Sequence, residues 1–396
     1  IMKKIIKLVD LYNQNTYEFE KKNIEFLSKY LENIIIINIG FIVKSNKVNY
    51  QNEFNSKFKI HSPKSILELK ELFLINDYPV LKCFSNDIKF FKINFFLSKV
   101  KNKIFVISNL GYQPQNFNYI NQKIKYNFKF FILQRLKYYF SRLLILINIY
   151  PKIDFFFESS EFIIEGIKKG FSEKLKKSIF GIDLSYYKKV IKINSRAWDN
   201  HFYQKFEKNE KYIVFIDGMI FDHPDRIMRE GPVNLENRSI YYKQMNKLLS
   251  HLANKYNKEI IICLHPKNNE SEFKKDFKEF KCVKYQTDKY INQSYLVLFH
   301  EGSSIIEAIL LKKKIINIDG KSLGSYINNR ASLYRKLLNL RKIDFDNYLN
   351  DIEKIDIKEL DNNFTNYDEY IKKNIVFDKS VSGVYQVVDY LKKSSF

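Results

Sequence analysis

The chain has 396 residues and a formal net charge of +23, from 67 lysines and arginines against 44 aspartates and glutamates. Hydrophobic residues make up 45% of it, so the length and composition suit two domains with sizeable cores. The three cysteines show neither metal-ligand spacing nor the even count of a disulfide framework, which excludes a disulfide-rich secreted scaffold. Without a secretory signal or an apolar run of roughly 20 residues, we expect a cytoplasmic protein, soluble or peripheral on the inner face of the membrane.

In the first half, strand-like and helix-like segments alternate. A helix that reaches about residue 31 and another at about 160–170 separate some of the strands. The expected strands lie at 5–9, 34–39, 79–84, 104–108, 152–157 and 178–182. Residues 185–211 hold many charges and no clear strand, so we assign them to a linker. Such alternation predicts a mostly parallel sheet with helices on both faces.

The segment 121–150 is basic and rich in aromatic and aliphatic residues, and it contains no acidic residue. A helix of this composition can lie in the interface of an anionic membrane. The alternative is an ordinary amphipathic helix that covers a sheet with its lysines and arginines in solvent.

The second half alternates more regularly. Helices are expected at 236–256, 271–279 and 303–311, and a last helix near the C-terminus. The expected strands lie at 212–217, 259–264, 281–285, 295–299 and 314–318. Five strands in this order predict a second Rossmann-like, doubly wound domain.

Polar clusters follow three of these strands, and parallel strands of an open sheet bind ligands outside their carboxyl ends. The clusters are Asp217-Gly218, His265-Pro266-Lys267, and Gly302-Ser303-Ser304. Two serines after a glycine, before a helix, suit a phosphate, because hydroxyls and unpaired backbone N–H groups converge there. Simple N-capping by a serine is the alternative.

Other residues near these clusters are candidates with more than one interpretation. Glu307, one turn into the helix, could accept hydrogen bonds from a ribose diol or be a solvated helix residue. His265 could donate to a departing phosphate, with Lys267 adding positive charge beside it, and His223 repeats the His-Pro pattern. Asp217 could deprotonate an acceptor hydroxyl, or shape a turn.

Asp10 and Glu158, which end strands of the first half, could be the base instead of Asp217. Cys/His ligand sets, HExxH and an Asp-x-Asp pair between strands are all missing from the sequence. We therefore expect neither a metal nor another cofactor.

The three clusters resemble the motifs of bacterial sialyltransferases of the GT-B type: acidic-acidic-Gly, His-Pro and Ser-Ser/Thr. Here they read Ile216-Asp217-Gly218, His265-Pro266 and Ser303-Ser304, with Ile216 in place of the first acid. The resemblance implies Asp217 as the general base and His265 as a general acid or a hydrogen-bond donor to the phosphate. It implies the two serines as phosphate ligands. We also assign Gly218, His223, Pro266, Lys267, Gly302 and Glu307 to the expected CMP-donor site.

The resemblance implies an α/β fold of the GT-B type, with two Rossmann-like domains facing a central cleft and a C-terminal helix. Residues 1–200 would bind the acceptor and residues 201–375 the nucleotide sugar, and the helix at 376–396 would pack back toward the first domain. The expected activity is metal-independent, inverting transfer of a nonulosonic acid or Kdo from a CMP-activated donor to a glycan or lipid-linked acceptor, such as lipopolysaccharide or capsule.

Three rival functions stay open. CDP-glycerol and CDP-ribitol phosphotransferases of teichoic acid synthesis also carry a His-Pro motif and a later Ser-Ser cluster. Nucleotide-sugar epimerases of the same two-domain shape place Ser, Gly and Glu at a strand-to-helix turn. A nucleic-acid-binding protein is disfavoured, because the basic residues are spread along the chain without a recognition motif, and codon bias toward Lys, Ile and Asn explains much of the charge.

Overall fold

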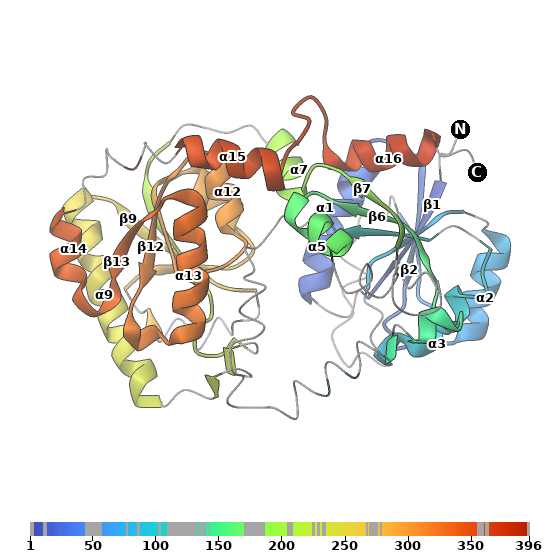
Figure 1. Ribbon diagram of the computed structural model, residues 1–396, viewed down its shortest axis with the longest axis horizontal. Coiled ribbons are helices and arrows are strands. Elements are labelled where there is room, and N and C mark those ends of the chain that lie inside the picture. The colour runs from blue at the N-terminus through green and yellow to red at the C-terminus, as the bar shows by residue number, and fades with distance from the viewer. Residues whose placement is uncertain are drawn as a thin grey trace. The chain divides into compact units, whose positions relative to one another are not determined.

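The computed structural model describes residues 4–10, 14–43, 58–76, 78–84, 88–101, 104–108, 133, 136, 140–141, 143–169, 187–203, 209–223, 226–227, 230–231, 235–266, 268, 276–277, 279–354, 360 and 364–393. The chain forms two compact units (Figure 1). Unit 1 comprises Ile1–Gly111, Ile132–Phe202 and Lys373–Phe396, and unit 2 comprises Tyr112–Phe131 and Tyr203–Lys372. The sequence had placed the divisions after residues 200 and 375.

Unit 1 is built on a seven-stranded sheet in the order β3-β2-β1-β4-β5-β6-β7, and the pairings between its neighbours are parallel. The strands are β1 (Lys4–Val9), β2 (Asn33–Asn38), β3 (Lys59–His61), β4 (Val80–Lys82), β5 (Ile104–Ser108), β6 (Ile153–Glu158) and β7 (Tyr187–Lys192). The helices are α1 (Gln14–Leu27), α2 (Ile66–Ile75), α3 (Phe91–Leu97), α5 (Glu161–Lys169), α7 (Arg196–Tyr203) and α16 (Gly383–Lys393), with a 3-10 turn η2 (Ile88–Phe90).

Both faces of this sheet are largely apolar where β1 and β2 lie, because these strands are rich in isoleucine and leucine and are buried on each side. Ile5 and Val9 of β1 pack with α1 and α16, whereas Ile6 and Leu8 pack with α2 and α3. Figure 1 shows α16 and the pair α2 and α3 on opposite sides of the sheet. One charged pair interrupts the α1 face, where Lys7 lies 2.7 Å from Glu20 with both side chains buried.

The C-terminal helix α16 is held to unit 1 by polar groups at its N-terminal end. The Asp199 carboxylate accepts hydrogen bonds from the backbone N–H groups of Gly383 and Val384. Asn194 donates to the carbonyl of Val381 at 2.8 Å. A Cβ at position 383 would lie 2.2 Å from the Asn194 carbonyl oxygen, so this approach requires glycine.

Unit 2 is built on a six-stranded parallel sheet in the order β10-β9-β8-β11-β12-β13. Its strands are β8 (Tyr212–Ile216), β9 (Glu259–Cys263), β10 (Lys281–Val283), β11 (Ser294–Phe299), β12 (Lys314–Asp319) and β13 (Arg341–Asp344). Its helices are α9 (Leu235–Tyr256), α11 (Thr287–Asn292), α12 (Ile305–Leu310), α13 (Ser325–Leu338), α14 (Tyr348–Lys354) and α15 (Phe364–Asn374), with 3-10 turns η4 (Lys321–Leu323) and η5 (Phe345–Asn347).

The strand order of unit 2 reverses direction between β8 and β11. The chain runs outward from β8 through β9 to β10 and then crosses back to β11 on the other side of β8. Helices α9 and α13 cover the face that carries Ile213 and Phe215. Tyr290 of α11 contacts Tyr212, which points to the other face. The carboxyl ends of β8 and β11 therefore flank a topological switch point, where open sheets of this type bind ligands.

The assignment of residues 185–211 to a linker without a strand is wrong. β7 occupies Tyr187–Lys192 and pairs with β6, and α7 follows it. The lysines of β7 obscured it in the sequence, but β7 is an edge strand, so they reach solvent and pair with acids: Lys188 lies 2.6 Å from Asp154, and Lys192 pairs with Glu161.

Three other sequence predictions fall wholly or partly on residues that the structure does not describe. The expected strand at 178–182 lies outside the described residues. Of the segment 121–150 the structure describes only 133, 136, 140–141 and 143–150, and of the expected helix at 271–279 only 276, 277 and 279. Within the described part of the chain, every helix is too short or too polar to cross a membrane.

Candidate functional site

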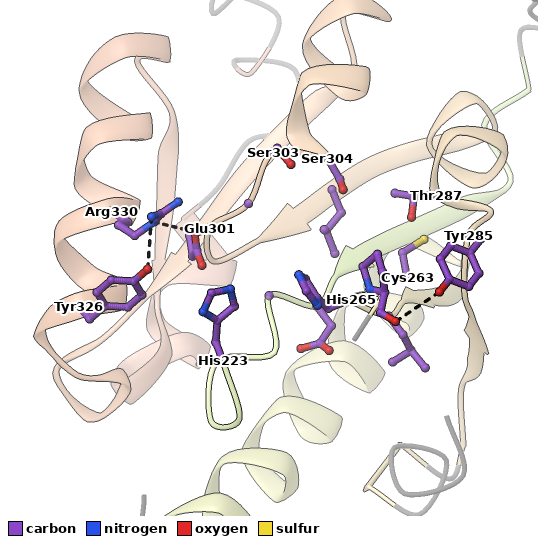
Figure 2. A pocket seen from close by; sticks show the side chains of 16 residues that line it. His223, Cys263, His265, Tyr285, Thr287, Glu301, Ser303, Ser304, Tyr326 and Arg330 are labelled. Carbon is purple, nitrogen blue, oxygen red and sulfur yellow. Dashed lines mark hydrogen bonds and ion pairs between the residues drawn. The ribbon is translucent and has the colours of Figure 1, made fainter. Parts of the chain in front are cut away.

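A cavity of about 230 Å³ lies in unit 2 at the carboxyl ends of β8, β9 and β11 (Figure 2). The chain segments that follow these three strands contribute most of its lining, and α13 contributes two further residues. The cavity therefore occupies the switch point of the sheet. Its volume is at the small end for ligand pockets, so it suits the phosphate and sugar part of a nucleotide more than a whole nucleotide sugar.

Asp217, directly after β8, is buried and holds two loops together. Its Oδ1 accepts a hydrogen bond of 3.1 Å from the backbone N–H of Met219, and its Oδ2 accepts one from the Asn268 side chain. The backbone N–H of His265 also donates to this carboxylate. Burial raises the pKa of Asp217 to about 6, although these hydrogen bonds lower it. The carboxylate thus fixes the loop after β8 to the His-Pro loop after β9.

The two His-Pro histidines meet in the cavity. The rings of His223 and His265 pack edge to face with their centroids 5.7 Å apart. Figure 2 shows His223 between His265 and the pair formed by Arg330 and Glu301. Pro266 lines the same wall, and its carbonyl accepts a hydrogen bond of 3.5 Å from Tyr285.

Arg330, in the middle of α13, brings a permanent positive charge to the cavity. Its Nε lies 2.7 Å from Oε2 of Glu301, which is 5% exposed, and its Nη1 lies 3.3 Å from the Tyr326 hydroxyl. Sequence reasoning missed Arg330 and Tyr326. The stretch SYINNRASLYRKLL carries no strand-end motif, and only the packing of α13 beside β11 and β12 brings these side chains to the site.

The loop after β11 presents glycine and two serines to the cavity. Gly302 has a φ of 143°, a conformation that favours glycine, and nothing lies within 4 Å of where its Cβ would be. Ser304 is the N-cap residue of α12, but its hydroxyl makes no capping hydrogen bond. Ser303 is exposed and also lines the cavity. The plain N-cap alternative therefore does not account for the two serines.

Gly218 lies at a close approach across the switch point. A Cβ there would lie 3.1 Å from the backbone carbonyl oxygen of Glu301, at the tight end of real contacts. The absence of a side chain lets the loop after β8 lie directly against the loop after β11. Gly218 thus sets the distance between the two halves of the cavity wall.

His300, between β11 and Glu301, is a structural residue. Its Nδ1 lies 2.8 Å from the carbonyl oxygen of Ile318, which can only accept, so Nδ1 carries the proton and Nε2 accepts from the Tyr241 hydroxyl at 2.7 Å. Burial lowers the pKa of His300 to about 4, so the ring is neutral at pH 7.

The structure brings Asp217, Gly218, His223, His265, Pro266, Gly302, Ser303 and Ser304 together around one cavity. Glu307 of α12 is not among the residues that line it, and Lys267 lies outside the described residues. The two alternative bases belong to unit 1. Asp10 follows β1, and Glu158 ends β6, where its buried carboxylate accepts hydrogen bonds from the backbone N–H groups of Ser159 and Ser160.

Among the side chains that the structure describes, no group of three or more His, Cys, Asp and Glu residues could hold a metal ion. A metal-independent reaction stays a prediction. The groups that face the cavity are instead suited to an anion: a guanidinium, two imidazoles and two hydroxyls. Both carboxylates in the lining, Asp217 and Glu301, are engaged by hydrogen bonds or by an ion pair.

No protein-family model and no curated protein sequence matches the chain. Similarity appears among solved structures. A protein from Listeria monocytogenes assigned as a UDP-N-acetylglucosamine 2-epimerase has a TM-score of 0.54 and 10% identity, covering 100% of this chain and 97% of its own.

Two further structures are similar over nearly the whole chain, each with a TM-score of 0.50 and 11% identity. A glycosyltransferase from Rickettsia africae covers 99% of this chain and 98% of its own, and a variant of the wall teichoic acid polymerase TagF covers 99% and 88%. At such identities the likeness shows the fold alone, and it agrees with the two doubly wound sheets described above. The chain has the GT-B fold.

Proposed function

We propose that the chain is a glycosyltransferase that moves a sialic-acid-like sugar, a nonulosonic acid or Kdo, from a CMP-activated donor to a surface-glycan or lipid-linked acceptor. One observation carries the proposal: at the switch point of unit 2, the described residues place Arg330, two histidines and two serines around one cavity whose carboxylates are already engaged. Such a lining attracts a phosphate and suits a nucleotide-activated donor.

The donor phosphate would lie against the loop after β11. The open space beside Gly302 lets an anion approach the backbone, and the hydroxyls of Ser303 and Ser304 can donate hydrogen bonds to phosphate oxygens. Arg330 can offer its remaining N–H groups to the same oxygens, because a guanidinium carries five donors. Cytidine as the base is proposed on the resemblance of the three motifs to those of sialyltransferases.

His265 would stabilise the departing CMP. Its loop is fixed by the hydrogen bond of its backbone N–H to Asp217, and its ring faces the cavity beside His223. An imidazole can donate a proton or a hydrogen bond to a leaving phosphate. Replacing His265 by alanine should lower turnover by about 10²-fold or more.

Three carboxylates are proposed for activation of the acceptor hydroxyl: Asp217, Asp10 and Glu158. Asp217 lines the cavity, but its oxygens already hold Met219 and Asn268. Asp10 and Glu158 end strands of unit 1. The base is the residue whose amide variant, Asp217→Asn, Asp10→Asn or Glu158→Gln, loses turnover by about 10²-fold or more while donor binding is kept.

The test of the proposed function is a donor panel. The purified protein is incubated with CMP-N-acetylneuraminic acid, CMP-Kdo, CDP-glycerol and UDP-N-acetylglucosamine, and the released nucleotide is measured with and without a glycan acceptor. We expect CMP release from a CMP-sugar, loss of this release in Ser303→Ala/Ser304→Ala, and normal release in the control Ser332→Ala, whose hydroxyl bonds to a helix carbonyl away from the cavity.

Two of the similar folds define the outcomes that would replace this proposal. Turnover of CDP-glycerol alone would indicate a CDP-glycerol phosphotransferase; a variant of a wall teichoic acid polymerase is among the similar structures. Acceptor-independent turnover of the UDP-sugar would indicate an epimerase.

A further inference from the structure

A row of exposed apolar side chains marks one face of the 133–147 stretch in unit 1. Leu133, Leu136, Phe140, Leu143 and Ile147 are between 46% and 58% exposed. Their spacing of three and four residues places them on one side of a helix, and the first four have helical backbone. Exposed large hydrophobic residues are normal when they are single, but a contiguous row indicates an interaction site. We call these five residues the apolar row.

The stretch that carries the apolar row is attached to unit 1 through other residues. Leu144, Ile145 and Tyr150 are buried together. The Tyr150 ring also contacts Phe91 of α3, with the ring centroids 5.9 Å apart. Phe91 in turn stacks on Phe95, and both rings are more than one third exposed. The apolar row is thus unused by the core, and exposed aromatic rings of α3 adjoin its C-terminal end.

The part of the sequence that contains α3 and the apolar row carries charge of one sign. From residue 88 to residue 153 the sequence contains ten lysines, two arginines and neither aspartate nor glutamate. Lys89 of η2, Lys92 of α3 and Lys99, which follows α3, are exposed. The Nζ atom of Lys89 lies 4.5 Å from the centroid of the Phe90 ring, and the Nζ atom of Lys99 lies 5.5 Å from the centroid of the Phe95 ring. Their positive charges therefore lie next to apolar surface.

Exposed apolar residues elsewhere in unit 1 do not share this setting. Leu67 and Leu74 of α2 are 67% and 74% exposed, but the same helix carries Glu68 and Glu71. A composition bias toward lysine would act on both regions alike. The absence of acids therefore distinguishes the sequence around the apolar row from α2.

We propose that the apolar row and the neighbouring α3 form a docking surface for an anionic lipid membrane. The apolar side chains would enter the boundary between headgroups and acyl chains, and the lysines would contact lipid phosphates, as amphipathic surfaces of this kind do. A second copy of the chain is a poorer occupant, because it would bring two acid-free, basic surfaces together. The inference is independent of the donor site, which lies in unit 2.

Vesicle sedimentation tests the proposal with the full-length protein. We expect binding to vesicles of phosphatidylglycerol and phosphatidylcholine, little binding to phosphatidylcholine alone, and weaker binding in 1 M salt, where the Debye length falls to about 3 Å. Leu136→Asp/Phe140→Asp should weaken binding by about tenfold or more, because each change removes a large apolar group from the lipid contact. The matched control, Leu67→Asp/Leu74→Asp, should bind as the unmodified protein does.

A second pair of variants keeps the proposal testable if the double aspartate variant does not fold. Lys89→Gln/Lys92→Gln leaves the apolar row intact and should lower binding to anionic vesicles several-fold. Thermal melting establishes that each variant is folded, and CMP release with a soluble acceptor reports on the donor site separately. A protein that is folded, releases CMP and still fails to bind anionic vesicles would overturn the docking surface and not the proposed function.

Three other results would also overturn the proposal. The first is equal binding to neutral and anionic vesicles. The second is a dimer in light scattering that Leu136→Asp/Phe140→Asp dissociates, which would assign the apolar row to self-association. The third is tight binding of random RNA without binding to vesicles, which would assign the basic charge to nucleic acid.

Discussion

Replacing Asp217 by asparagine removes the charge of a buried carboxylate that accepts hydrogen bonds from two loops. The shape of the side chain is kept. The new amide can still accept the hydrogen bond from Met219. Its NH₂ group would meet the Asn268 side chain, whose Oδ1 is buried and has no hydrogen-bond partner among the described residues. A rotation of the Asn268 amide would therefore restore the contact between the two loops without the charge.

The size of the effect follows from burial. The pKa of Asp217 is raised from 3.8 to about 6, chiefly because the ionised carboxylate is taken out of water. One pKa unit corresponds to about 1.4 kcal/mol, so the shift corresponds to about 3 kcal/mol. Between about pH 4 and pH 6 the folded protein binds the proton more tightly than the unfolded chain. The free energy of unfolding should therefore fall as the pH rises through this window.

Denaturant unfolding at a series of pH values measures this directly. From about pH 4 to pH 7, the unmodified protein should lose about 3 kcal/mol of stability relative to Asp217→Asn. Asp217→Ala should be less stable than Asp217→Asn at every pH, by about 1–3 kcal/mol, because it leaves buried N–H donors without an acceptor. Parallel pH profiles for the unmodified protein and Asp217→Asn would refute the reasoning.

Three further predictions concern other residues. Gly218→Ala should lower the free energy of unfolding by about 1–2 kcal/mol in thermal melts, because its Cβ would press on the Glu301 carbonyl, and equal stability would contradict this close approach. A double-mutant cycle of Glu301→Gln and Arg330→Met should show a coupling energy of about 0.5–3 kcal/mol in the free energy of unfolding, measured with denaturant. Additive effects of the two changes would mean that the ion pair contributes nothing. Burial lowers the pKa of Lys82 to about 7, so the folded protein should lose stability as the pH falls from about 10.5 to 7, and Lys82→Met should abolish this dependence; an unchanged profile would contradict it.

The central strands could be predicted from the sequence because their side chains are apolar on both faces. The short apolar runs that form β1, β2, β9 and β11 are typical of strands buried on both faces of a parallel sheet. The strands β3, β7 and β13 were missed. They lie at or next to the sheet edges, where short segments such as KIH and RKID or the lysines of β7 reach solvent, and periodicity gives no signal for them.

The residues of the site also differ in whether their positions could be predicted from the sequence. Asp217, His265 and Ser303 follow apolar strands directly, so their position at the sheet edge could be derived from sequence order alone. Arg330 could not, because its place depends on how α13 packs. Glu307 was expected in the cavity because it lies one turn after the serines, but it does not line the cavity, since the direction of a helical side chain is set by tertiary packing.

We propose that the cavity at the switch point of unit 2 binds the phosphate of a cytidine nucleotide. Isothermal titration of CMP and UMP into the unmodified protein and into Ser303→Ala/Ser304→Ala tests it most directly. We expect CMP to bind at least about tenfold more tightly than UMP, a difference of about 1.4 kcal/mol, and the double variant to lose this binding. CMP binding that is undetectable, no tighter than that of UMP, or unchanged in the double variant would contradict it.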